Sequence, residues 1–416
     1  MKKFLAILLA FCMVFALCIT AEAAPAEEKT VLTLWCIATE SDSNHDAYVK
    51  AIEDFNASHD DVEIQWEAFE NESYKTKIKA AAQAGELPDI FFSWSLAFLG
   101  DFVDAGAAKN LDDYYAPYDG QLPEVMLANT TYDGHHYAAP LNMNIITLFA
   151  NMDLLAEAGY TEIPGTYEEL CDCCDKLLEK GITPFGVSGK ESWCVTEYLE
   201  PIILKTIGVD ELKNIYAKDS TWNNEDIAKS IDIFQEMIDK NYFDPNALAL
   251  GNDEVKENFI AGKYAFYQNG SWNCGDINDG TDATIQVGEF PVMNADNASL
   301  GMQIGGPNDC LAVNANSANA DAAAKAVFEV ARDVCHYGFL AGSGLPSWTP
   351  DYDTSEINPL TNAVAEMVSV SKGMVLFGDN SLSADDAGIY LDYVMQAYGK
   401  EIDGKTFTEG LAGDLG

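Results

Sequence analysis

Basic side chains are scarce in this sequence. Its 416 residues include 23 Lys and Arg against 67 Asp and Glu, which gives a formal net charge of -44. A surface this acidic repels nucleic acid and anionic lipid, so neither is expected as a partner. Arg332 is the only arginine, and the chain therefore lacks the bidentate clamp that commonly holds phosphate or carboxylate ligands. The composition favours a neutral ligand.

Long apolar segments are absent after the first twenty residues. Lys2 and Lys3 precede an apolar run over residues 4–19, and residues 21–23 (Ala-Glu-Ala) have the small-residue pattern of a cleavage site. The run is short for a membrane span, so residues 1–23 are predicted to be a secretory signal peptide. Cys18 could carry a lipid anchor, although the bulky Leu17 before it disfavours that processing. We expect an exported protein, at the extracellular face or in the periplasm, and leave anchoring open.

The chain also lacks a convincing metal motif. Cys171, Cys173 and Cys174 lie in a predicted helix on which neighbouring positions diverge, and no His or Cys pair follows at zinc spacing. His135 and His136 follow an Asp-Gly hairpin turn, and adjacent side chains of a strand point to opposite faces. The eight cysteines beyond the signal segment are irregularly spaced and do not define a disulfide framework. We expect no metal and no other cofactor.

What the chain does contain is an alternation of strand and helix patterns. At roughly 390 residues, the mature chain exceeds what one hydrophobic core usually supports, so two lobes are expected. The predicted fold class is α/β, with a mixed sheet flanked by helices in each lobe. The first predicted strands span residues 31–35, 62–66 and 90–92, and the helices between them span 47–56 and 74–84.

Polar and aromatic residues follow the ends of these predicted strands. Glu40 and Ser41 lie in the loop after the first strand, and Ser93 and Trp94 directly follow the apolar run at 90–92. In an open α/β sheet the carboxyl ends of the strands face the ligand crevice, so these side chains are predicted to converge at one edge. The alternative is a tryptophan that merely covers a sheet edge.

Two more tryptophans follow small polar turns. Trp193 ends a Gly and Ser loop, and Trp272 ends the sequence Asn-Gly-Ser-Trp. Asn142 and Asn144 share one face of an extended segment that leaves the first lobe at Pro140, and their amides can bind hydroxyl groups as donors and acceptors. The sequence at 301–306 (GMQIGG) is glycine-rich enough for a ligand to approach the backbone.

The order of these motifs resembles that of the extracellular solute-binding proteins of ABC importers, in the carbohydrate-binding group related to maltose-binding protein. The matching pieces span nearly the whole mature chain. They are VLTLW at 31–35, YKTKIKAAAQAGELPDIFF at 74–92, AAPLNMNIITLFANMDLLAEAG at 138–159, NFIAGKYAFYQNGSW at 258–272 and GMQIGG at 301–306.

This resemblance implies two lobes built from discontinuous segments and joined by two or three hinge strands. Lobe 1 would comprise residues 24–139 and 289–335, and lobe 2 would comprise 140–288 and 336–416. A monomer would capture a sugar or oligosaccharide between the lobes and deliver it to the permease subunits of an ABC transporter, without catalysis. The implied ligand contacts are Glu40, Ser41, Ser93, Trp94, Asn142, Asn144, Trp193 and Trp272, with Gly305, Gly306 and Asp379 as weaker transfers.

Two other functions remain open at this point. The same fold could bind a polyamine or another cationic solute, because acidic and aromatic side chains also hold cations. A secreted glycosidase would need two carboxylates across a similar cleft, and with 67 acidic residues their mere presence carries little weight. No nucleophile-elbow spacing is present around Ser188 or Ser343.

Overall fold

The computed structural model describes residues 29–293 and 301–415. The predicted signal peptide, residues 1–23, and Cys18 lie outside the described residues. Within the described ranges, no helix combines the length and the apolar character needed to cross a bilayer.

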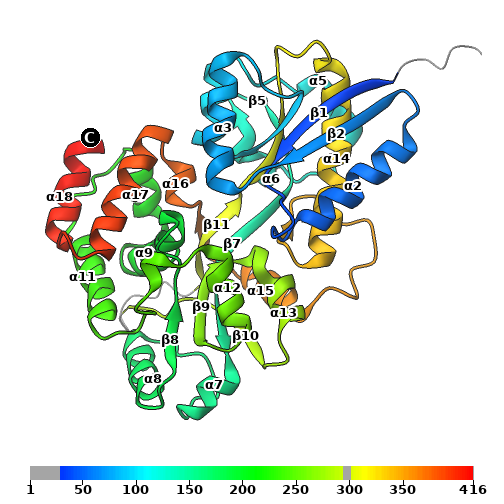
Figure 1. The fold of residues 1–416 in the computed structure, drawn as a ribbon. Coiled ribbons are helices and arrows are strands. Elements are labelled where there is room, and N and C mark those ends of the chain that lie inside the picture. The colour runs from blue at the N-terminus through cyan, green and yellow to red at the C-terminus, as the bar shows by residue number, and fades with distance from the viewer. Residues whose placement is uncertain (1–28, 294–300, 416) are drawn as a thin grey trace, which may run out of the picture.

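The first lobe is built on a five-stranded sheet (Figure 1). The central strand β3 pairs parallel with β1 and antiparallel with β12, and β1 continues parallel to β2. Helix α3 lies on one side of the sheet, and α2 and α14 pack together on the other. In sheet order the strands are β2 (Val62–Ala68), β1 (Thr30–Cys36), β3 (Ile90–Trp94), β12 (Asp309–Val313) and β6 (Ala138–Pro140), and the main helices are α2 (His45–Ser58), α3 (Asn71–Ala84), α4 (Ala97–Asp104) and α14 (Ala320–Ala341).

The second lobe is built on a seven-stranded sheet around β7, whose ten residues are all buried. Strands β10 and β13 pair with β7 beside the main path of the sheet. The strands are β14 (Gly373–Val375), β11 (Met302–Pro307), β7 (Asn142–Asn151), β9 (Tyr264–Gly270), β8 (Thr183–Gly186), β10 (Ile285–Gly288) and β13 (Leu345–Pro346).

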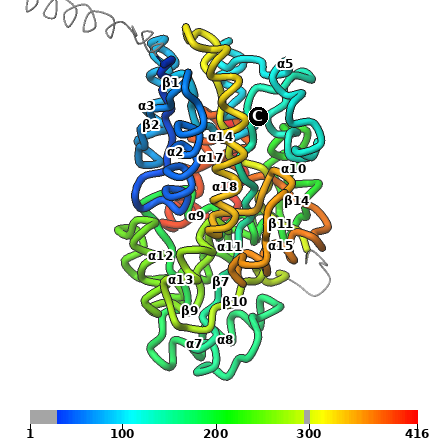
Figure 2. The backbone as a smooth tube through the Cα atoms, turned by 90° about the vertical axis from the view of Figure 1, so that its right-hand side faces the viewer, coloured from blue at the N-terminus to red at the C-terminus, as the bar shows by residue number. Residues whose placement is uncertain are grey.

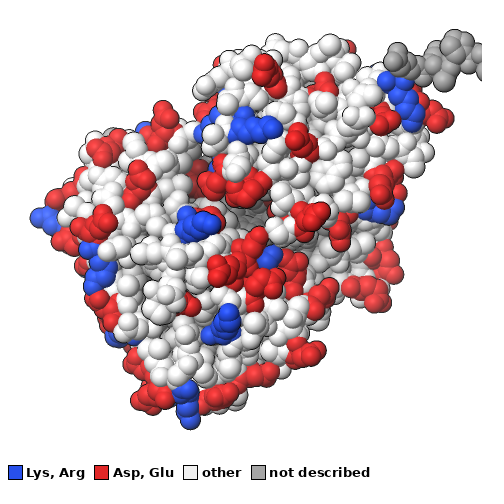
Figure 3. All heavy atoms as spheres, in the orientation of Figure 1, with Lys and Arg blue, Asp and Glu red and all other residues white. Residues whose placement is uncertain are grey.

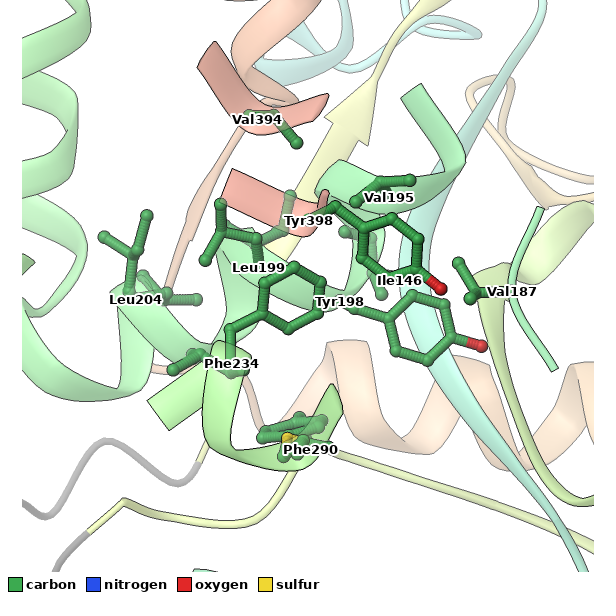
Figure 4. Close-up of a cluster of buried hydrophobic side chains, with 14 of the residues drawn as sticks. Ile146, Val187, Val195, Tyr198, Leu199, Leu204, Phe234, Phe290, Val394 and Tyr398 are labelled. Carbon is green, nitrogen blue, oxygen red and sulfur yellow. The ribbon is translucent and has the colours of Figure 1, made fainter. Parts of the chain in front are cut away.

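Helices cover this second sheet, and the hydrophobic core of the lobe lies between the helices and the sheet. Figure 4 shows Tyr198 and Leu199 of α9 beside Phe234 of α11 and Tyr398 of α17, all buried. Burial of these aromatic and aliphatic side chains contributes to the hydrophobic stabilisation of the lobe. The helices are α7 (Met152–Glu157), α8 (Tyr167–Glu179), α9 (Ser192–Ile207), α10 (Val209–Tyr216), α11 (Glu225–Asp239), α12 (Asn252–Ile260), α13 (Cys274–Gly280), α15 (Pro359–Ser369), α16 (Gly378–Ser381), α17 (Ala384–Tyr398) and α18 (Gly404–Leu415).

Local sequence determines several element ends. Thr166 and Glu169 form a reciprocal capping box at the start of α8. Gly85 ends α3 with a φ of 71°, the left-handed conformation that glycine adopts without strain. Asp133 and Gly134, at φ of 50° and 81°, form the tight turn of the predicted hairpin. The short elements are α5 (Asp112–Tyr115), η1 (Ala116–Tyr118), α6 (Glu124–Leu127), η2 (Ala128–Thr130), β4 (Thr131–Tyr132), β5 (His135–His136), η3 (Ala247–Ala249) and η4 (Ser271–Asn273).

Within the described residues, the chain passes between the sheets at three places. Strand β6 continues into β7 through Leu141, β11 continues into β12 through Asn308, and α14 continues into β13 through residues 342–344. Figure 2 shows the resulting separation, with β1, β2 and α3 at one end of the molecule and β9, α7 and α8 at the other. Strand β11 belongs to the second sheet, and helix α14 continues past residue 335 without a break. The boundaries of the two lobes at residues 139, 288 and 335 remain a prediction.

Candidate ligand-binding site

A cavity of about 450 Å³ lies between the two lobes. This volume is within the range of pockets that enclose small ligands. Figure 3 shows a hollow near the middle of the molecule, with acidic side chains gathered around it. The first lobe contributes residues of the loop after β1, the start of α3 and Trp94; the second contributes the starts of α9, α12 and α16 and Trp272; and a crossing contributes Asn308 and Asp309.

Three tryptophans line this cavity from three separate segments. Trp193, in the first turn of α9, has its ring centroid 6.0 Å from that of Trp272 in η4, and Trp272 lies 6.2 Å from Phe377. These three rings form an aromatic wall on the second lobe. Trp94, the last residue of β3, contributes an aromatic ring from the first lobe, and the Nζ atom of Lys75 lies 5.2 Å from the centre of that ring.

The structure separates the predicted site residues into two groups. Besides the three tryptophans, Ser41 and Asp379 also line the cavity. The predicted residues that do not line it are Glu40, Ser93, Asn142, Asn144, Gly305 and Gly306.

Different physical causes keep these residues away from the cavity. Glu40 lies between the lining residues Thr39 and Ser41 but is exposed to solvent. Ser93 alternates with Trp94 along β3, is fully buried, and donates from Oγ to the carbonyl oxygen of Trp94 at 2.9 Å. A Cβ atom on Gly305 would lie 2.1 Å from the carbonyl oxygen of Asn144, so the glycine-rich strand approaches strand β7 rather than a ligand.

Sequence reasoning missed most of the polar lining. Glu70 accepts hydrogen bonds from the backbone N–H groups of residues 72 and 73 and so caps α3, while Asn252 begins α12. The sequence pattern that could have identified them is the presence of polar residues at the starts of helices. Such residues usually cap a helix, and here they also face the cavity. The remaining missed polar residues are Asp42, Ser43, Asn44, Asn71, Lys75, Lys190, Glu191, Thr196, Glu197, Asp253, Glu254, Asn308, Asp309 and Asn380.

The side-chain amide of Asn252 is held in one orientation. Its Oδ1 atom accepts from Asn269 Nδ2 at 3.2 Å, from Tyr267 OH at 3.4 Å and from Cys194 Sγ at 3.5 Å. Three donors on the oxygen leave Nδ2 as the free polar group of this amide. Asn252 is therefore arranged as a hydrogen-bond donor of the cavity wall.

Several carboxyl groups of the cavity hold protons more tightly than usual. Burial, and to a smaller extent the charge of Asp42, raises the pKa of Asp309 to about 8. Burial also raises the pKa of Asp42 to about 6, although the backbone N–H of Asn44 donates to its Oδ1 at 2.9 Å and acts in the opposite direction. The pKa of Glu197 lies well above its ordinary value because the side chain is buried and because Asp379 is close. Near neutral pH some of these carboxyl groups can therefore donate as well as accept hydrogen bonds.

Comparison with known proteins identifies the family. A sequence model described as bacterial extracellular solute-binding protein matches residues 41–332. The chain belongs to this family. Family members are extracellular binding proteins, which agrees with the fold class and with the family resemblance described above.

Individual relatives agree with this assignment. A maltotriose-binding protein of Pyrococcus abyssi (strain GE5 / Orsay) is 25% identical over 249 residues, covering 58% of this chain and 49% of the relative. A probable sugar-binding periplasmic protein of Rhizobium meliloti (strain 1021) is 29% identical over 249 residues, covering 59% of this chain and 52% of the relative. The chain thus spans about half the length of the curated relatives it matches.

Solved structures match over nearly the whole chain. A structure from a study of xylan utilization by the thermophilic bacterium Caldanaerobius polysaccharolyticus has a TM-score of 0.89 and 29% identity, covering 93% of this chain and 100% of that one. A chitin oligosaccharide binding protein, at 21% identity, has a TM-score of 0.85 and covers 93% of this chain and 98% of that one. The second likeness shows the shared fold.

Proposed function

We propose that this protein captures a sugar or oligosaccharide in the cavity between its lobes and delivers it, as a monomer, to the permease subunits of an ABC transporter. One observation carries the proposal: aromatic rings from both lobes line a single cavity together with amide and carboxyl groups. Sugars present apolar C–H faces that pack on aromatic rings, and hydroxyl groups that both donate and accept hydrogen bonds. The relatives that bind maltotriose or were studied in xylan utilization support the same ligand class.

The polar groups of the cavity suit hydroxyl groups. Asn252 offers a donor in a fixed orientation, and protonated Asp309 offers a donor and an acceptor on one carboxyl group. The ligand contacts that we propose are the cavity-lining residues among those predicted from sequence, namely Ser41, Trp94, Trp193, Trp272 and Asp379. Closure of the lobes around the ligand would desolvate these contacts together, which strengthens each of them.

A cationic solute is the competing ligand, because eight acidic side chains and two lysines line the cavity. The acidic residues are Asp42, Glu70, Glu191, Glu197, Asp253, Glu254, Asp309 and Asp379. Ionisation of Asp42 and Asp309 between about pH 5.5 and about pH 8.5 adds negative charge to the cavity, and a cation should then bind more tightly as pH rises. Affinity for a neutral sugar should not rise with that charge, because ionisation of Asp309 removes the proton that it donates to a hydroxyl group.

Calorimetric titration distinguishes these ligands. The protein is titrated with a panel of malto-, xylo- and chito-oligosaccharides and with putrescine, at about pH 5.5 and about pH 8.5. We expect saturable binding of at least one oligosaccharide and no saturable binding of putrescine. Binding of putrescine alone, increasing with pH, would replace the sugar by a cation.

Tryptophan fluorescence provides an independent measurement. The cavity tryptophans should change their emission on ligand binding, and Trp222→Phe serves as the matched control because Trp222 is buried in the core of the second lobe. A response that is lost in Trp272→Phe and kept in Trp222→Phe supports the proposed site. Incubation with chromogenic glycosides tests the remaining alternative, and we expect no release of the chromophore.

A further inference from the structure

Four buried polar side chains lie behind the cavity, where the lobes are joined. Asn142 and Asn144 project from β7, Ser271 begins η4, and Ser343 lies between α14 and β13. Their exposed fractions are 7%, 0%, 2% and 2%. Polar groups are costly to bury unless they are hydrogen-bonded, so the partners of these four side chains are informative.

The four residues form a series of hydrogen bonds in which Ser343 takes part through both its backbone carbonyl and its side chain. Ser271 Oγ donates to Asn144 Oδ1 at 2.9 Å, and Asn144 Nδ2 donates to Asn142 Oδ1 at 3.3 Å. Asn142 Nδ2 then donates to the carbonyl oxygen of Ser343 at 3.3 Å. Finally, Ser343 Oγ donates to the carbonyl oxygen of Ser43. We call this series the hinge relay.

Both ends of the hinge relay reach the wall of the cavity. Ser43 belongs to the loop after β1 and lines the cavity from the first lobe, and Ser271 directly precedes Trp272, which lines it from the second. The relay passes across β7 and the segment that joins α14 to β13, which are two of the three connections between the sheets.

A glycine packs against the middle of the hinge relay. A Cβ atom on Gly344 would lie 2.8 Å from Asn144 Oδ1 and 3.2 Å from Asn142 Nδ2. The φ of this residue is 136°, a backbone conformation that residues other than glycine rarely adopt. The backbone therefore packs closely against both amides and leaves little room for them to turn without moving residues 342–344.

We propose that the hinge relay couples the two walls of the cavity, so that a change at Trp272 in the second lobe alters the loop at residues 41–44 in the first. The side chains of Asn142 and Asn144 act through this relay and not by touching the ligand. A ligand that binds one arrangement of the walls more tightly shifts the population toward it, and the relay links both walls to that shift. The proposal concerns the chain itself and does not depend on the ligand being a sugar.

The coupling is tested first in the unliganded protein, by hydrogen–deuterium exchange measured by mass spectrometry. The variants Ser271→Ala and Asn144→Leu interrupt the relay on the second-lobe side. The readout is the exchange of amides in the first-lobe loop, where Asp42 N–H donates to the Thr39 carbonyl oxygen at 2.9 Å. Interruption should speed this exchange roughly fivefold, as expected for the loss of one hydrogen bond of ordinary strength.

Asn56→Leu is the matched control. Asn56 makes two hydrogen bonds with the backbone of Ile64, at 2.9 and 2.7 Å, and these lie within the first lobe. This variant also loses two partly buried amide hydrogen bonds, but it should leave exchange at residues 39–45 unchanged. Small-angle X-ray scattering should show a changed average separation of the lobes in Asn144→Leu and not in Asn56→Leu.

The outcomes separate this inference from the proposed function. Unchanged exchange in the loop for both folded relay variants, with unchanged scattering, would overturn the hinge relay. If Asn144→Leu fails to fold, Ser271→Ala alone decides, because it removes only a hydroxyl group. Absence of binding to any sugar would refute the proposed ligand and leave the exchange result standing. If a sugar binds, its dissociation rate should change in the relay variants and stay unchanged in the control.

Discussion

Glu200 provides a quantitative test of the electrostatics behind the cavity wall. It is fully buried on α9, and its Oε1 atom accepts from the backbone N–H of Gly378 at 3.0 Å and from Tyr390 OH at 3.0 Å. Gly378 begins α16, which carries the cavity residue Asp379. A carboxyl group thus holds the segment that forms one wall of the binding site.

The expected effect of pH on stability follows from the pKa of this group. Burial, together with the nearby charge of Asp379, raises the pKa of Glu200 from 4.5 to about 8, although the hydrogen bonds from Tyr390 and Gly378 act in the opposite direction. Between these values the folded chain binds a proton that the unfolded chain has lost. The free energy of unfolding therefore falls as pH rises, at up to about 1.4 kcal/mol per pH unit, and the total approaches about 5 kcal/mol at pH 8.

The substitution Glu200→Gln should remove this dependence. Glutamine resembles the protonated acid, and its oxygen can still accept from Gly378 and Tyr390. Urea unfolding should show similar stability for both proteins near about pH 5 and a variant more stable by several kcal/mol near about pH 8. Glu53→Gln, at an exposed position of α2, is the control and should leave the profile unchanged. Parallel pH profiles for the wild type and Glu200→Gln would refute the reasoning.

Three further predictions concern the aromatic wall, the strand packing and the oriented amide. Trp272→Ala should weaken ligand binding at least about tenfold in calorimetry, because two ring contacts and the stacking surface are lost. Gly305→Ala should lower the free energy of unfolding by more than about 3 kcal/mol in urea, whereas Gly413→Ala, with nothing within 4 Å, should raise it by up to about 1 kcal/mol. Asn252→Asp keeps the oxygen that accepts three bonds and removes the donor, so it should weaken binding about tenfold by calorimetry with little change in melting temperature.

The fold class and the family were predictable because they depend on local patterns that recur along the chain. Apolar runs identified β1 and β3, and the Asp-Gly turn identified the hairpin at residues 131–136. The order of these motifs sufficed to predict a solute-binding protein, and the family match and the solved structures confirm that prediction. Each of these signals involves residues close together in the sequence.

The candidate site was only partly predictable, because a cavity is formed by residues far apart in the chain. Tryptophans after polar turns were a useful signal, because an aromatic ring next to polar groups suits a ligand that has both apolar faces and hydroxyl groups. The spacing of Asn142 and Asn144 correctly placed them on one face of β7, but not against residues 342–344, which lie about two hundred positions away. The glycines at 305 and 306 indicated close approach, and only the pairing of β11 with β7 showed that the approaching group is backbone.

The sequence by itself determined the alternation of strands and helices, the scarcity of basic side chains and the positions of the aromatic rings, because these follow from residue type and near neighbours. Only the tertiary structure decided which side chains share the cavity and which carboxyl groups are buried enough to keep their protons. Side-chain burial and the meeting of distant segments depend on how two sheets and their crossings pack, and that packing is a property of the whole chain.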